Sequence, residues 1–144
     1  MEPSNSNRRQ FDNLAAATDN IIDSPSLRRS ILVVDDEQNF LTLLHWFLTQ
    51  RGYEVSTASS GDEALKLWSD RAFDVALIDL RLGTCDGLVL LDEMTKCLPA
   101  AKIFMMTAYP TVTSIKQAFD KGACRYLTKP VDLQELAKAL RSLF

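Results

Sequence analysis

The sequence predicts an α/β fold in which helices cover both faces of a parallel sheet. Between residues 31 and 144, five short apolar runs alternate with five segments of helical periodicity. Most of the apolar runs are continuous rather than alternating, which is typical of strands buried on both faces. Regular alternation of strands and helices favours a doubly wound sheet, because each crossover returns the chain to a parallel neighbour.

The first half of the domain supplies two strands and two helices. A strand is expected at 31–34, followed by a helix over about 37–51 that ends before Gly52. The apolar face predicted for this helix consists of Phe40, Leu43, Leu44, Phe47 and Leu48. Residues 53–58 alternate as a second strand, and Ser60 and Glu63 have the spacing of a capping box that begins a helix through about Asp70.

The second half repeats the pattern. A third strand at 73–78 precedes a helix at 87–97, which Pro99 terminates, and a fourth strand follows at 102–106. The remaining elements are a helix at about 111–121, a fifth strand at 123–127 and a last helix that begins after Asp132 and ends at Phe144. Short connections between five strands and five helices predict a flavodoxin-like, doubly wound five-stranded parallel sheet with strand order 2-1-3-4-5.

Polar side chains follow four of the predicted strands. Asp35 and Asp36 follow the first strand and Asp79 the third, whereas Thr107 and Lys129 follow the fourth and fifth. Because the carboxyl ends of parallel strands meet in one crevice, we expect these side chains to lie together. Carboxylate oxygens suit Mg²⁺, and a carboxylate is also a nucleophile toward phosphorus. An ammonium and a hydroxyl nearby would neutralise and bind a phosphoryl group.

Each of these residues also has an ordinary structural interpretation. An aspartate at a strand end commonly forms a turn, and Asp36 or Thr107 can cap a helix. Lys129 and Pro130 can form a simple loop, although a cis bond between them would turn the ammonium inward. The occurrence of all five residues at the ends of the appropriate strands favours a shared site.

Several segments of residues 30–144 match one family of signalling domains. They are Val34-Asp35-Asp36-Glu37, Gly52-Tyr53-Glu54-Val55, Gly61-Asp62-Glu63-Ala64-Leu65, Asp79-Leu80-Arg81, Asp86-Gly87, Met106-Thr107-Ala108-Tyr109, Gly122-Ala123 and Tyr126-Leu127-Thr128-Lys129-Pro130. With these segments, the chain resembles the receiver domain of two-component response regulators, most nearly receivers of nitrogen-regulator type.

The resemblance implies a phosphorylatable switch that controls an effector and does not turn over a separate substrate. Asp79 would accept a phosphoryl group from a histidine kinase or a histidine phosphotransfer protein. Mg²⁺ would be held by Asp35, Asp36, Asp79 and the backbone carbonyl of Arg81.

The resemblance assigns three further residues. Thr107 and Tyr126 would form the switch pair, and Lys129 would contact the phosphoryl group.

The loop after the acceptor departs from the family pattern. Gly83 stands where a proline is usual, and a glycine there is expected to loosen the loop that supplies a metal ligand. Arg81 and Tyr109 each lie two residues beyond a site residue and should flank the phosphoryl group. Bulky side chains in both positions would hinder the hydrolytic water and predict a long-lived phosphorylated form.

Two surfaces are candidates for partners. On the first helix, Leu41, His45 and Trp46 are predicted to face outward beside the acceptor, where a kinase or phosphotransfer helix would dock. The last two helices and their strand carry a mixed-charge face, which in the family dimerises or meets an effector. Its residues are Lys116, Asp120, Lys121, Arg125, Glu135, Lys138 and Arg141.

Composition excludes several other classes. The net charge of −3 gives no general attraction to nucleic acid or anionic membrane, and no apolar run approaches the roughly 20 residues that span a bilayer. Three cysteines without paired spacing indicate free thiols, and with no signal peptide they favour a cytoplasmic protein.

Residues 30–144 form the predicted receiver, and residues 1–29 form an extension that is either disordered or a short amphipathic helix. Apolar residues recur in this extension at helical spacing: Phe11, Leu14, Ala15, Ile21 and Ile22. No effector follows Phe144, so the sequence is expected to be a stand-alone receiver or a fragment of a longer regulator.

Two alternative functions remain open. A small phosphatase of haloacid dehalogenase type has a second aspartate two residues after its nucleophile, where this chain has Arg81. A docking module that is never phosphorylated would keep the same residues without using them. A nucleotide-binding module is disfavoured, because no glycine-rich loop follows the first strand.

Overall fold

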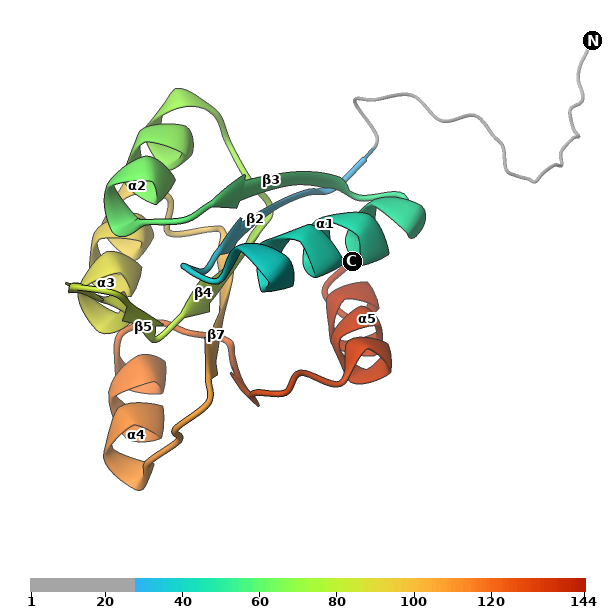
Figure 1. Ribbon diagram of the computed structural model, residues 1–144. Helices are drawn as coiled ribbons and strands as arrows, with labels where there is room; N and C mark the ends of the chain where they lie inside the picture. Colours follow the sequence, from blue (N-terminus) through green and yellow to red (C-terminus); the bar gives the residue numbers. More distant parts are fainter. Residues whose placement is uncertain (1–27) are drawn as a thin grey trace, which may run out of the picture.

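The sheet has the predicted topology. The computed structural model describes residues 28–144, and its five-stranded sheet is parallel throughout, with order β3-β2-β4-β7-β8 (Figure 1). The strands are β2 (Ser30–Val34), β3 (Glu54–Ala58), β4 (Val75–Asp79), β7 (Lys102–Thr107) and β8 (Arg125–Thr128). In chain order this is 2-1-3-4-5, so the predicted fold class is confirmed.

In the described part of the chain, five helices cover the two faces of the sheet. They are α1 (Gln38–Gln50), α2 (Gly61–Asp70), α3 (Gly87–Cys97), α4 (Val112–Asp120) and α5 (Leu133–Arg141). One core cluster joins the sheet to α2, α3 and α4, and a second joins it to α1 and α5 (Figure 1). Within the described residues, no helix is long and apolar enough to cross a bilayer.

The central strand β4 shows why the apolar runs are continuous. Val75 and Leu77 belong to the core beneath α1 and α5, whereas Ala76 and Ile78 belong to the core beneath α2, α3 and α4. All four side chains are fully buried. Successive residues of a strand point to opposite faces, so a strand covered on both sides must be apolar at every position.

The phase of α1 differs from the predicted one. Leu43 was expected to face the core but is 43% exposed, whereas Leu41, expected on the surface, is 2% exposed. Leu41, Leu44 and Leu48 follow the i, i+3, i+7 spacing of a single helical face, and this face packs on the sheet. Because two leucines on either side of the stripe are chemically equivalent, only the packing decides which one is buried.

A short hairpin follows β4 that the sequence did not predict. β5 (Arg81–Leu82) pairs antiparallel with β6 (Cys85–Asp86), and Gly83 in the turn has φ of 60°. Proline, which is usual at this position in the family, is restricted to φ near −65° and cannot adopt this conformation. Glycine here allows the tight turn of the hairpin after Asp79, and the expected loosening of the loop stays a prediction.

Two further predictions concern the N-terminal extension and the cysteines. The extension lies outside the described residues except for Arg28 and Arg29, and the proposed boundary near residue 30 remains a prediction. Among the described residues the cysteines are all free thiols, with Cys97 and Cys124 exposed and Cys85 half-buried.

Candidate functional site

Four strands deliver polar side chains to the carboxyl edge of the sheet. Asp79 and Thr107 are the last residues of β4 and β7, and they are 7% and 1% exposed. Asp35 directly follows β2 and is fully buried, whereas Asp36 beside it is exposed. Polar groups buried so deeply need partners. The side chains predicted from the strand ends therefore lie together at this edge.

Lys129 supplies the partner for two of the carboxylates. Its ammonium donates to Asp35 Oδ2 at 2.5 Å and to Asp79 Oδ2 at 3.0 Å. The backbone N–H of Lys129 donates to the carbonyl of Thr107 at 2.8 Å, which fixes the start of the side chain beside β7. The Lys129–Pro130 peptide bond is cis, as anticipated. The ring of Phe40 in α1 lies 4.6 Å from the ammonium and covers its other side.

The second oxygen of each bridged carboxylate binds the backbone that follows it. Asp35 Oδ1 accepts from the N–H of Glu37 at 2.8 Å, and Asp79 Oδ1 accepts from the N–H of Arg81 at 3.0 Å. Such bonds to the residue two positions on are a preferred conformation of aspartate at the end of an element. They hold both carboxylates in fixed orientations toward Lys129.

The electrostatics of the pair follow from burial and proximity. Burial raises the pKa of Asp35, and the hydrogen bonds from Lys129 and the Glu37 N–H partly offset the increase. Burial alone would lower the pKa of Lys129, but its hydrogen bonds to Asp35 and Asp79 outweigh burial and raise it. Lys129 therefore remains a cation at neutral pH.

The three carboxylates have the composition and spacing of a divalent-cation site. One oxygen from each of Asp35, Asp36 and Asp79 lies within 4.8 Å of the others. Hard carboxylate oxygens are the ligands that Mg²⁺ prefers. Three ionised carboxylates against the single ammonium of Lys129 leave two negative charges, which a divalent cation would neutralise. The residues present therefore fit the predicted metal.

Arg81 and Tyr109 form one unit beside the acceptor. The Arg81 guanidinium lies 5.2 Å from the centre of the Tyr109 ring, which is 66% exposed. The Tyr109 N–H donates to Thr107 Oγ1 at 3.1 Å, so the Thr107 hydroxyl keeps its own proton for another acceptor. The structure thus joins two residues that the sequence analysis predicted separately.

Tyr126 has a partner that the sequence did not reveal. Its hydroxyl and Ser114 Oγ are 2.8 Å apart, and Ser114 also forms the capping box of α4 with Thr111. Within residues 28–144, no hydrogen bond joins the side chains of Thr107 and Tyr126. In this conformation the half-buried ring of Tyr126 is tied to the first turn of α4.

Comparison with known proteins identifies the family. A model described as the response regulator receiver domain matches residues 31–141. The chain belongs to this family. It is 40% identical to the transcriptional regulatory protein ZraR of Escherichia coli over 110 residues, which are 76% of this chain and 25% of that protein. The chain therefore spans about a quarter of the length of the curated relatives it matches.

Solved receivers have the same fold. A CheY-like receiver domain protein from Methanospirillum hungatei has a TM-score of 0.78 and 30% identity, covering 80% of this chain and 92% of that one. The NtrX receiver domain from Brucella abortus has a TM-score of 0.73 and 32% identity, covering 78% and 95%. A Burkholderia pseudomallei response regulator was solved with a phosphorylated aspartic acid, calcium ion and citrate. Its TM-score is 0.75 and its identity 37%, and the match covers 78% of this chain and 66% of that one.

Gly87, which the sequence analysis named only as part of the Asp86-Gly87 segment, has a structural role in the receiver site. A Cβ atom added there would lie 2.5 Å from the carbonyl oxygen of Asp79 and 2.8 Å from the Cα atom of Leu80. The Gly87 N–H donates to the Leu80 carbonyl at 2.8 Å. The first residue of α3 thus lies directly against the backbone of the acceptor. Only the position of glycine after Asp86, the cap of α3, hinted at this role.

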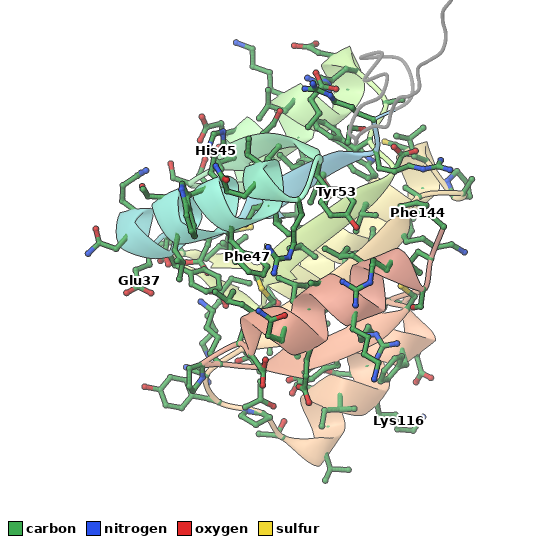
Figure 2. The ribbon with its side chains drawn as sticks, turned by 90° about the vertical axis from the view of Figure 1, so that its right-hand side faces the viewer. Glu37, His45, Phe47, Tyr53, Lys116 and Phe144 are labelled. Carbon is green, nitrogen blue, oxygen red and sulfur yellow. The ribbon has the colours of Figure 1, made fainter. Side chains whose placement is uncertain are left out.

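The predicted docking residues of α1 do not lie on one surface. Leu41 is buried in the core beneath α1, so its assignment to an exposed partner surface is wrong. His45 and Trp46 are exposed, Trp46 by 59%, and His45 projects outward from α1 in Figure 2. Leu43, also exposed, is the apolar neighbour of Trp46 that the sequence analysis had placed in the core.

Proposed function

We propose that this receiver accepts a phosphoryl group on Asp79 from a histidine kinase or a histidine phosphotransfer protein. The observation that carries the proposal is the buried Asp79 carboxylate, held between Lys129 and the Arg81 N–H at the edge where Asp35, Asp36 and Thr107 converge. The Burkholderia relative with a phosphorylated aspartic acid supports it.

The chemistry of the transfer needs one nucleophile. An oxygen of the Asp79 carboxylate attacks phosphorus, a P–O bond forms, and the P–N bond of the phosphohistidine donor breaks with its electron pair going to the imidazole nitrogen. Lys129 stabilises the negative charge on the phosphoryl oxygens, and the Thr107 hydroxyl donates a hydrogen bond to one of them. After phosphorylation, the Lys129 ammonium would bind the phosphoryl group in place of the Asp79 carboxylate.

Asp35, Asp36, Asp79 and the carbonyl of Arg81 would hold Mg²⁺ in this site. Bound there, the ion would supply positive charge opposite Lys129 and thereby lower the repulsion between the phosphoryl group and the carboxylates.

The switch follows from the contacts of Thr107 and Tyr126. A phosphoryl oxygen competes for the Thr107 hydroxyl, and movement of Thr107 opens space into which Tyr126 turns. That turn breaks the hydrogen bond between Tyr126 and Ser114, so the first turn of α4 loses a partner. The last two helices and β8 would carry this change to an effector or to a second copy of the domain. Transcriptional regulators among the relatives support an effector of that class.

The decisive experiment is intact-protein mass spectrometry after incubation with acetyl phosphate and Mg²⁺. The expected result is one added phosphoryl group that disappears in Asp79→Asn, a variant with nearly the same shape, and without Mg²⁺. Asp70→Asn, at the exposed end of α2, should be phosphorylated like the unchanged protein.

Two other outcomes would overturn the proposal. Steady hydrolysis of a generic phosphate ester, lost in Asp79→Asn, would instead assign the site to a phosphatase. The absence of an adduct with acetyl phosphate and with a panel of phosphorylated histidine kinases would indicate a docking module that is not phosphorylated.

We further propose that the exposed face of α1 around His45 and Trp46 contacts the phosphoryl donor, and that the protein acts in the cytoplasm. Trp46 is a large apolar side chain exposed on α1, the helix that begins directly after Asp35 and Asp36, and such residues commonly anchor an interface. Trp46→Ala should slow transfer from the kinase by about tenfold while leaving phosphorylation by acetyl phosphate unchanged. Equal rates of kinase-driven transfer for the two proteins would exclude this surface.

A further inference from the structure

A groove rich in arginine lies at the end of the domain opposite the acceptor. Four arginines, Arg28, Arg29, Arg51 and Arg141, line it together with Tyr53 and Phe144, and its volume is about 420 Å³. These six residues define the basic groove. They lie before β2 and β3 or at the end of α5, whereas Asp79 lies at the carboxyl ends of the strands. Figure 2 accordingly places Phe144 toward the side of the domain opposite Glu37, with Tyr53 between them.

Three arginines of the basic groove, Arg29, Arg51 and Arg141, form no ion pair with a described carboxylate, and Arg29 and Arg51 are held by stacking on aromatic rings. The guanidinium of Arg29 lies 4.4 Å from the centre of the Phe144 ring, and that of Arg51 lies 4.0 Å from the centre of the Phe47 ring. Among residues 28–144, no carboxylate forms an ion pair with Arg29, Arg51 or Arg141. A stacked guanidinium keeps donors at its edge, so less entropy is lost when it binds an anion.

Two of these arginines also act on Tyr53, whose pKa is raised overall because the side chain is partly buried. Burial raises this pKa, and the charges of Arg141 and Arg51 oppose the increase. By contrast, Arg71 at the same end of the sheet pairs with Glu54 at 3.2 Å. Arg29, Arg51 and Arg141 therefore give the basic groove positive charge that no ion pair among the described residues balances.

An apolar hollow of about 280 Å³ adjoins the basic groove and shares Phe144 with it. Its apolar walls include Phe73, Leu98, Ala101 and Leu143, and the charged residues Asp74 and Lys102 also line it. Phe144 is 46% exposed at the boundary between the two. A single ligand that filled both would need negative charges on one side and apolar groups on the other.

Residues 11–23 of this chain have that composition. They include three aspartates, Asp12, Asp19 and Asp23, and no lysine or arginine. Their large apolar residues are Phe11, Leu14, Ile21 and Ile22. We call this stretch the acidic segment. Four residues, 24–27, connect it to Arg28 in the wall of the groove, and an extended chain of that length reaches roughly 14 Å.

We propose that the acidic segment binds in the basic groove of its own chain, with its aspartates toward the arginines and its apolar side chains in the adjoining hollow. Covalent connection favours this occupant over a separate molecule, because a short tether gives an effective concentration of about millimolar. The bound segment would bridge the ends of α1 and α5 without covering Asp79.

Hydrogen–deuterium exchange of the full chain tests the proposal. In the unchanged protein, the amides of residues 11–23 should exchange at least about threefold more slowly than in the unstructured peptide of the same sequence. Arg51→Glu with Arg141→Glu should abolish the protection, since both side chains lie at helix ends and face the groove. Lys66→Glu with Lys121→Glu changes the net charge equally at exposed sites outside the groove and should leave protection intact.

A second pair of variants distinguishes loss of the proposed contact from misfolding of the domain. Asp19→Asn with Asp23→Asn alters no described residue and should also remove the protection. Combining Asp19→Arg and Asp23→Arg with the two groove substitutions should restore it, because the charges are then exchanged. Protection should weaken in about 1 M salt, where charges are screened over about 3 Å.

Three results would overturn the proposal. They are peptide-like exchange of residues 11–23 in the unchanged chain, equal protection after the groove substitutions, and protection that rises with protein concentration. The last would assign the segment to the groove of a second copy. Phosphorylation of Asp79 by acetyl phosphate is expected to be unchanged in the groove variants, so the two proposals fail independently.

Discussion

Arg81 and Tyr109 are in contact beside the acceptor, and we propose that this contact limits the access of water to it. The two side chains follow Asp79 and Thr107 and meet over a distance of 5.2 Å, so together they form a cover rather than two separate obstacles. We expect Arg81→Ala or Tyr109→Ala to accelerate dephosphorylation by roughly three- to tenfold, about 0.7–1.4 kcal/mol in the barrier.

The measurement is the decay of the phosphorylated protein by mass spectrometry after removal of acetyl phosphate. Because the side chains touch, the double variant should decay little faster than either single variant. Unchanged decay in both single variants would exclude the cover, and fully additive effects would show that the two residues act separately.

Residues at strand ends were predictable for a physical reason that does not extend to their partners. Asp79 and Lys129 each end an apolar run, and the parallel sheet alone brings such positions together. The hydrogen bond between Tyr126 and Ser114 depends instead on the rotamer of a half-buried ring and on where α4 begins. Neither is visible as a periodic pattern in the sequence.

At the scale of elements, the hairpin after β4 depends on the conformation of Gly83. A positive φ of 60° excludes proline but is accessible to asparagine, and a Cβ there would meet only Asp36 Oδ2, at 3.8 Å. Gly83→Pro should therefore destabilise the domain by more than about 1 kcal/mol, and Gly83→Asn by less.

Urea unfolding of the two variants and the unchanged protein measures this difference. A Gly83→Pro variant as stable as the unchanged protein would show that the hairpin is not needed for the fold. The hairpin escaped prediction because its strands have only two residues each, too few for a periodic pattern.

The junction of β4 and α3 depends on Gly87. An added methyl group would approach backbone atoms of Asp79 and Leu80 to 2.5–2.8 Å, and backbone cannot move aside as a side chain can. We expect Gly87→Ala to cost about 3 kcal/mol and to reduce phosphorylation, because the acceptor itself would shift.

Gly52→Ala is the matched control, with φ of 92° but no atom within 4 Å of the added Cβ. It should cost about 1 kcal/mol from backbone strain alone and leave phosphorylation unchanged. Similar losses of both stability and phosphorylation in the two variants would contradict the argument from close approach.

The caps of the helices could be predicted from the sequence, but the rotation of α1 about its axis could not. The cap residues of α2 and α5, Ser60 and Asp132, were predictable because side-chain caps need a particular residue type at a particular spacing. The exposed Leu43 and buried Leu41 were not, because an apolar stripe has no sharp edge in the sequence. Packing of α1 against the sheet fixes its rotation to within a fraction of a turn.

Across the whole molecule, charge is distributed between two ends. Asp35, Asp36 and Asp79 gather at the carboxyl ends of the strands, and the basic groove lies at the other end. Cations are therefore expected at one end and anions at the other. The three carboxylates at the acceptor end repel one another, and a bound divalent cation would relieve this repulsion.

Stability should therefore depend on Mg²⁺. Ligand binding to the native state raises the free energy of unfolding by about 1.4 kcal/mol when the ligand is at ten times its dissociation constant. Asp36→Asn removes an exposed carboxylate of the cluster, so it should reduce this gain and at the same time stabilise the protein without Mg²⁺.

Thermal unfolding with and without Mg²⁺ separates the two effects. Asp70→Asn is the matched control, since it removes an exposed carboxylate from the end of α2 and should leave the Mg²⁺-dependent gain unchanged. The opposite signs expected for Asp36→Asn distinguish loss of a ligand from general damage to the fold, which would lower stability in both conditions. Equal gains from Mg²⁺ in all three proteins would show that Asp36 is not a ligand.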